Sequence, residues 1–123
     1  HAGVAYALTG LLRAFPWHAR RGQVFLPQAL LTATGVDRED IVSGADSPGL
    51  RAVLAEMRAR ARDHLAKARA LKGRLGPEVQ PAFLPLAMVE RYLEPMEKRS
   101  YQPYKTIIDA ANWVRIWAMW RGW

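Results

Sequence analysis

Cysteine is absent from the 123-residue chain, which excludes disulfide bonds and thiolate chemistry and leaves the redox compartment open. No apolar run reaches the roughly 18 residues that a transmembrane helix needs, and no secretory signal opens the sequence. Sustained alternation of apolar and polar residues, which would indicate half-buried strands, is also lacking. The sequence therefore predicts an all-α fold, with residues 1–123 in a single domain.

Apolar side chains and positive charge are abundant. Half of the residues are hydrophobic, enough for a modest core, and the formal net charge is +7. Between Leu50 and Arg74, eight basic residues stand against two acidic ones. Such a segment suits an anionic membrane, nucleic acid or a diphosphate. Nucleic acid is the least supported partner, because this segment has no aromatic residue and the chain has no recognisable nucleic-acid motif.

Apolar spacing and local stop signals place the expected helices. Pro16 should end or kink the first helix. Ser47 and Pro48 form a favourable helix start, whereas Pro85 and Pro95 should kink or interrupt a later helix. The expected helices cover residues 3–14, 27–32, 38–42, 48–72, 77 or 80 to 98, and 105–120.

Residues 8–27 read LTGLLRAFPWHARRGQVFLP. This stretch resembles the second aspartate-rich region of the squalene/phytoene synthase family, roughly LTNxLRDxxEDxxRGRxYLP. The resemblance implies an isoprenoid synthase-like helical bundle around an apolar cavity. Because family members are longer and the chain starts at His1 in mid-motif, we expect a C-terminal portion of such a bundle. The matching residues are Leu8, Thr9, Leu11, Leu12, Arg13, Arg21, Gly22, Phe25 (for Tyr), Leu26 and Pro27.

The acidic residues of that region are missing. Gly10 stands for Asn, and Ala14, Trp17 and His18 stand where the family has carboxylates that hold Mg²⁺ on the substrate diphosphate. Mg²⁺ prefers oxygen ligands, whereas alanine offers none, tryptophan only donates, and imidazole suits softer metals. We therefore expect no metal site and no cofactor here, and a half-buried His18 beside Trp17.

Two further sets of residues are candidates by resemblance. Arg13, Arg20 and Arg21 correspond to arginines near the diphosphate, and guanidinium groups suit phosphate oxygens. Ordinary surface charge accounts for them as well. Tyr92, in RYLEP, resembles a cavity-lining tyrosine of the family, although a tyrosine on an apolar stripe is more often part of the core.

The C-terminal segment carries Trp113, Trp117 and Trp120 at helical spacing with arginines alongside. Tryptophan beside arginine is typical of membrane interfaces. The same spacing suits packing onto a protein partner or onto a missing N-terminal half. Apolar stripes over residues 50–71 and 83–96 also need more cover than three or four helices readily give, so we expect the isolated chain to self-associate.

The resemblance leads to two functional hypotheses. In the first, the chain is a non-catalytic family member that binds protein or a prenyl lipid, like a branch of the family that includes an assembly factor for respiratory complex I. In the alternative, it is an active prenyltransferase that joins two prenyl diphosphates head to head, using Mg²⁺ held by upstream carboxylates. We expect a cytoplasmic protein with peripheral contact at the inner face of the membrane.

Overall fold

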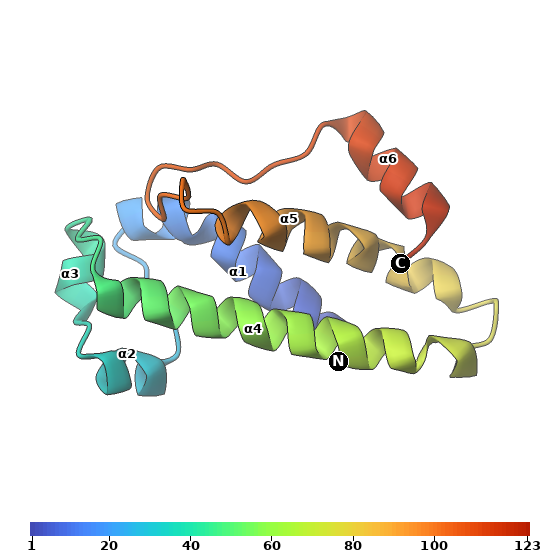
Figure 1. The fold of residues 1–123 in the computed structure, drawn as a ribbon, viewed down its shortest axis with the longest axis horizontal. Coiled ribbons are helices and arrows are strands. Elements are labelled where there is room, and N and C mark those ends of the chain that lie inside the picture. Colours follow the sequence, from blue (N-terminus) through green and yellow to red (C-terminus); the bar gives the residue numbers. More distant parts are fainter.

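The computed structural model describes all residues 1–123, and it consists of helices and loops with no strand (Figure 1). The prediction of an all-α fold is confirmed. No helix combines the length and the apolar character that crossing a membrane requires. The elements are α1 (Ala2–Arg20), α2 (Gln28–Thr34), α3 (Arg38–Val42), α4 (Pro48–Ala70), the 3₁₀ helices η1 (Lys72–Arg74) and η2 (Gln80–Met88), α5 (Val89–Met96) and α6 (Asn112–Arg121).

The long helix α4 is the scaffold of the molecule. α1 lies beside it and runs in the opposite direction, and η2 and α5 return along the same bundle (Figure 1). α2 and α3 pack at the end where α4 begins, and α6 lies near the other end, over η2. The core fills the space between α1, α4 and α5, where Leu12, Leu54 and Leu93 are almost fully buried.

The apolar stripe of α4 explains this arrangement. Its members recur every three or four residues, so they share one face of the helix. α1, α2 and α5 cover that face, which means that the stripe expected to need outside cover is buried within the chain. Only Leu71 at its end is exposed, by 41%. The buried members are Leu50, Val53, Leu54, Met57, Ala61, Leu65 and Ala68.

The start of α4 is fixed by local chemistry. The hydroxyl of Ser47 accepts a hydrogen bond from the amide of Leu50 at 3.1 Å, and Pro48 occupies the first helical position. Gly49 follows at a close approach to the end of α2. A Cβ atom there would lie 2.9 Å from the carbonyl oxygen of Thr34 and 2.9 Å from the side chain of Val36. The sequence-based prediction of this helix start is confirmed.

Pro16 does not end the first helix, contrary to our expectation. α1 continues through Pro16 to Arg20. The proline removes one backbone donor, which costs helix stability. However, Phe15, Pro16 and Ala19 are all buried in the core, and the burial of these side chains offsets the missing hydrogen bond.

Two other helix boundaries also differ from expectation. The segment 80–96 is divided between η2, which carries Pro81 and Pro85, and α5, which is α-helical from Val89. The expected interruption at Pro85 is observed, whereas Pro95 lies inside α5 and does not interrupt it. Pro85 removes a backbone donor that an α-helix would need, and the segment forms the tighter 3₁₀ helix instead. Pro81 lies in the first turn, where the backbone donor has no intrahelical partner. The last helix begins at Asn112 rather than Lys105, and residues 105–111 form an extended strap across the bundle.

We predict that Gly49→Ala destabilises the protein even though alanine favours helices. The added methyl group must displace the Thr34 backbone, and overpacking of this kind typically costs about 1–3 kcal/mol. Gly3→Ala is the matched control, because Gly3 is also the second residue of a helix but has nothing within 4 Å of its Cβ position. Chemical denaturation monitored by circular dichroism gives both values. A Gly49→Ala protein as stable as the Gly3→Ala protein would contradict the close packing.

Candidate functional site

Three of the four altered motif positions line one surface depression. Gly10, Ala14 and Trp17 lie on the same face of α1, together with Arg13, and the strap formed by residues 105–111 closes the other side through Ile107, Ile108 and Asp109. The depression has a volume of about 340 Å³. Apart from Arg13 and Asp109, the residues that line it are apolar or glycine.

His18 lies apart from this depression. Its ring meets that of Phe25 edge to face, with the ring centroids 4.6 Å apart. The side chain is half-buried, while Trp17 is 48% exposed. His18 therefore packs against the segment that follows α1, and it does not line the depression.

Arg13 is held by the chain itself. Its Nε donates to the carbonyl oxygen of Ile108 at 3.0 Å, and its Nη2 donates to Oδ1 of Asp109 at 3.3 Å. The guanidinium carbon lies 3.8 Å from the centroid of the Tyr92 ring. Tyr92 is buried, with 6% of its surface exposed. The structure thus brings Arg13 and Tyr92 together, as a cation–π pair beneath the strap.

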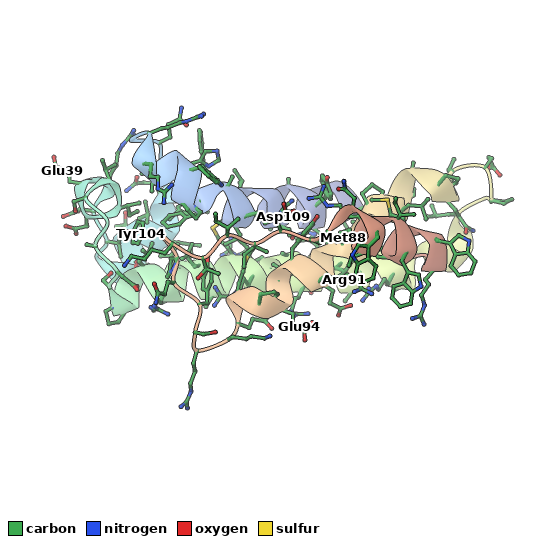
Figure 2. The ribbon with its side chains drawn as sticks, turned by 90° about the horizontal axis from the view of Figure 1, so that it is seen from above. Glu39, Met88, Arg91, Glu94, Tyr104 and Asp109 are labelled. Carbon is green, nitrogen blue, oxygen red and sulfur yellow. The ribbon has the colours of Figure 1, made fainter.

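Asp109 is the point where two guanidinium groups meet. Arg115 also donates to Oδ1 of Asp109, and the amide of Ala110 donates to the same oxygen at 2.8 Å. Figure 2 shows Asp109 on the strap between Tyr104 and α6. The Ala110 amide, followed by the Arg115 guanidinium, holds the pKa of Asp109 below its usual range.

Arg115 is only partly satisfied by its hydrogen bond to Asp109. Its Nε is buried and has no hydrogen-bond partner, although 35% of the side chain is exposed. The hydrogen bond to Asp109 raises the pKa of Arg115, and the neighbouring Tyr92 adds to this effect. Arg115 therefore stays charged, and Asp109 compensates two cations with one carboxylate.

Arg20 and Arg21 do not join this cluster. The guanidinium of Arg20 lies 5.4 Å from the Trp17 ring centroid. Arg21 directly follows the last residue of α1 and is exposed. Because neither residue forms an ion pair, they remain available to solvent while Arg13 is engaged.

The residues around the depression do not fit Mg²⁺. The only carboxylate there is Asp109, which is already engaged by two guanidinium groups. The chain contains no group of three or more His, Cys, Asp or Glu side chains that could hold a metal ion. A hard divalent cation needs several oxygen ligands, so these residues alone would not hold one.

The basic face of α4 is largely compensated within the chain, which the sequence did not lead us to expect. Arg51 pairs with Asp46 at 2.7 Å, whereas Arg62 and Arg69 reach across to the segment 90–97. Burial lowers the pKa of Arg58. The α4 ion pairs to α5 and beyond are Arg62–Glu97 at 2.6 Å, Arg62–Glu90 at 3.5 Å and Arg69–Glu90 at 3.0 Å.

The sequence analysis did not single out Ile108 or Asp109, and it took Arg115 only as one of the arginines beside the C-terminal tryptophans. It placed all three on one helix, where Asp109 would have been an ordinary surface residue. One signal was available, because the β-branched run Thr106–Ile107–Ile108 disfavours a helix and favours extended backbone. Nothing in the sequence indicated that this strap would return to α1.

The fold and the depression define an all-α bundle protein that keeps the frame of a prenyl synthase motif without its carboxylates. The chain belongs to the squalene/phytoene synthase family, whose family model matches residues 1–121. No solved structure matches the chain significantly.

Curated relatives include proteins of two kinds. Complex I assembly factor 6 of Rattus norvegicus is 31% identical over 95% of this chain and 37% of its own length. The 15-cis-phytoene synthase of Synechococcus elongatus is 26% identical over 93% of this chain and 37% of its own length. The phytoene synthase of Thermus thermophilus is 42% identical over 49% of this chain and 21% of its length. The chain thus spans little more than a third of the first two relatives and about a fifth of the third.

We predict that Asp109→Asn loosens the strap. The amide cannot compensate Arg13 and Arg115, so backbone amides of residues 105–111 should exchange with deuterium faster than in the parent protein. Acidification should act in the same direction. Because the folded-state pKa of Asp109 is depressed, its contribution is present above the unfolded value of about 3.9 and is lost as the pH falls through the folded value.

Asp63→Asn is the control for this experiment. Asp63 pairs with Lys67 one turn further along the exposed side of α4, and it does not contact the strap. Its substitution should leave exchange in residues 105–111 unchanged. Equal exchange in the Asp109→Asn and parent proteins would contradict the role of Asp109 as the anchor of the strap.

Proposed function

We propose that this chain is part of a non-catalytic family member that acts by binding a protein partner, in the manner of a respiratory-complex assembly factor. The observation that carries the proposal is the lining of the depression on α1. Gly10, Ala14 and Trp17 gather there, and Arg13 is held by Asp109 of the same chain.

The residues that line the depression lack the carboxylates that metal-dependent prenyl transfer requires. Such chemistry needs carboxylates on adjacent helical turns to hold Mg²⁺ against a diphosphate. At the altered motif positions, α1 carries Gly10, which has no side chain, Ala14, which has a methyl group, and Trp17, which has an indole ring. A diphosphate approaching Arg13 would also have to displace the Asp109 carboxylate, which already lies 3.3 Å from the guanidinium.

The relatives support the choice of a protein partner. Several curated relatives, including those of rat and human, carry the name of a complex I assembly factor, and the rat protein aligns with 95% of this chain. The phytoene synthases among the relatives support the alternative, an active prenyltransferase with carboxylates supplied from outside these 123 residues. Two experiments separate the two functions.

The first is a condensation assay on the full-length protein with farnesyl or geranylgeranyl diphosphate and Mg²⁺. We expect no head-to-head product, because the residues at 10, 14, 17 and 18 cannot hold the metal. A phytoene synthase assayed in parallel shows that the substrates and conditions are competent. Metal-dependent turnover that persists in an Arg13→Ala, Arg21→Ala variant would overturn the non-catalytic assignment, and turnover lost in that variant would establish the prenyltransferase.

The second is genetic complementation. We expect deletion of the gene in its host to lower the amount of assembled complex I on native gels, and the parent gene to restore it. Arg20→Ala, Arg21→Ala should restore it equally well, because neither arginine forms an ion pair and the proposed function uses no diphosphate. Unchanged complex I in the deletion strain would contradict the assembly role, and failure of the double variant alone would indicate an anion-dependent function.

A further inference from the structure

The outer face of α6 is apolar, and nothing in the chain covers it. Trp113, Ile116 and Trp120 are exposed by 72%, 69% and 83%, and Trp117 by 44%. Their spacing of three and four residues places them on one side of the helix. The opposite side, which includes buried Ala118, packs against η2. The outer face formed by residues 113, 116, 117 and 120 is called the α6 ridge below.

Free positive charge lies beside the α6 ridge. The guanidinium of Arg121 lies 4.7 Å from the centroid of the Trp117 ring, and that of Arg91, from α5, lies 5.4 Å from the same ring. Neither arginine forms an ion pair, although both line an open groove of about 490 Å³ between α4, α5 and α6. Two carboxylates, Glu90 and Glu94, share that groove.

Those two carboxylates do not cancel the arginines. Glu90 is engaged by Arg62 and Arg69 from α4, at 3.5 and 3.0 Å. Glu94 is exposed and forms no ion pair, and α6 itself contains no acidic residue. The groove therefore keeps excess positive charge next to the α6 ridge, whereas the basic face of α4 is mostly compensated.

We propose that α6 docks on the surface of an anionic lipid bilayer. Indole rings favour the boundary between lipid headgroups and acyl chains, and guanidinium groups favour lipid phosphates. The 10 residues of α6 span only about 15 Å, half of the roughly 30 Å apolar thickness of a bilayer, so the helix lies along the surface. The α6 ridge enters the interface, while Arg91 and Arg121 contact phosphate groups beside it.

This inference does not depend on the proposed function, because it concerns lipid binding and not the choice between assembly factor and enzyme. Binding to the bilayer has an electrostatic part and an apolar part, and the two can be measured separately. The electrostatic part is screened by salt, whereas the burial of indole rings is not. Binding should therefore weaken at high salt without disappearing.

The test is co-sedimentation of the full-length protein with vesicles. Vesicles of phosphatidylcholine with phosphatidylglycerol should bind the protein, and vesicles of phosphatidylcholine alone should bind it far more weakly. Trp113→Ala, Trp120→Ala should abolish the binding that remains at high salt. Tyr6→Ala is the matched control, since Tyr6 is an aromatic residue that is 53% exposed on α1 and is not part of the α6 ridge.

A second pair of variants tests the arginines. Arg91→Gln, Arg121→Gln should weaken binding at low salt by about fivefold for each residue. Arg60→Gln, Lys67→Gln removes the same charge from the exposed side of α4 and should have a much smaller effect. Equal losses from the two pairs would mean that binding follows net charge alone, which would overturn docking through α6.

Other outcomes would overturn the proposal as well. If the α6 ridge is covered by another part of the polypeptide or by a protein partner, the parent protein will not bind anionic vesicles. In that case Trp113→Ala, Trp120→Ala will instead lower the melting temperature of the full-length protein or its complex. Circular dichroism on the same variants separates this outcome from loss of binding by a folded protein.

Discussion

The apolar contact between α1 and α4 is the interaction on which the other features of the molecule depend. Leu12, Leu54 and Met57 are each about 1% exposed or less, and full burial of such side chains contributes about 1.5–3 kcal/mol each. This contact keeps α1 helical beyond Pro16, where local backbone chemistry alone would end it. It also fixes which side of α1 faces outward, and that side carries Gly10, Arg13, Ala14 and Trp17.

Local features of the fold could be predicted from the sequence because their causes are local. The start of α4 follows from Ser47 and Pro48, and its buried stripe follows from helical spacing of apolar residues. The expected bounds of α3, residues 38–42, are those observed. The resemblance of residues 8–27 to a known motif likewise identified Arg13 and the altered metal positions, and the structure shows three of these positions around one depression. That Trp17 shares a helix with Arg13 was not expected, because the helix was predicted to cover residues 3–14 only.

Features that depend on distant partners could not be predicted in this way. Pro16 stays helical because the core buries Phe15 and Ala19, which the local sequence does not reveal. The strap over 105–111 is held by Arg13, more than 90 positions earlier. The basic face of α4 looked uncompensated because Glu90 and Glu97, which pair with Arg62, lie far along the chain. In each case a contact of long sequence separation overrides or completes a local preference.

The loss of the motif carboxylates changes where charge is balanced in the molecule. An arginine facing a depression needs an anion, and in a prenyl synthase the diphosphate of the substrate can supply it. Here Asp109 supplies it from within the chain, and it serves Arg13 and Arg115 together. Ion pairs likewise compensate much of α4. Arg91 and Arg121, which flank Trp117, have no such partner. The compensated cations therefore lie at the motif face of α1 and along α4, whereas the free ones lie beside the exposed indole rings of α6, where we propose that an anionic surface binds.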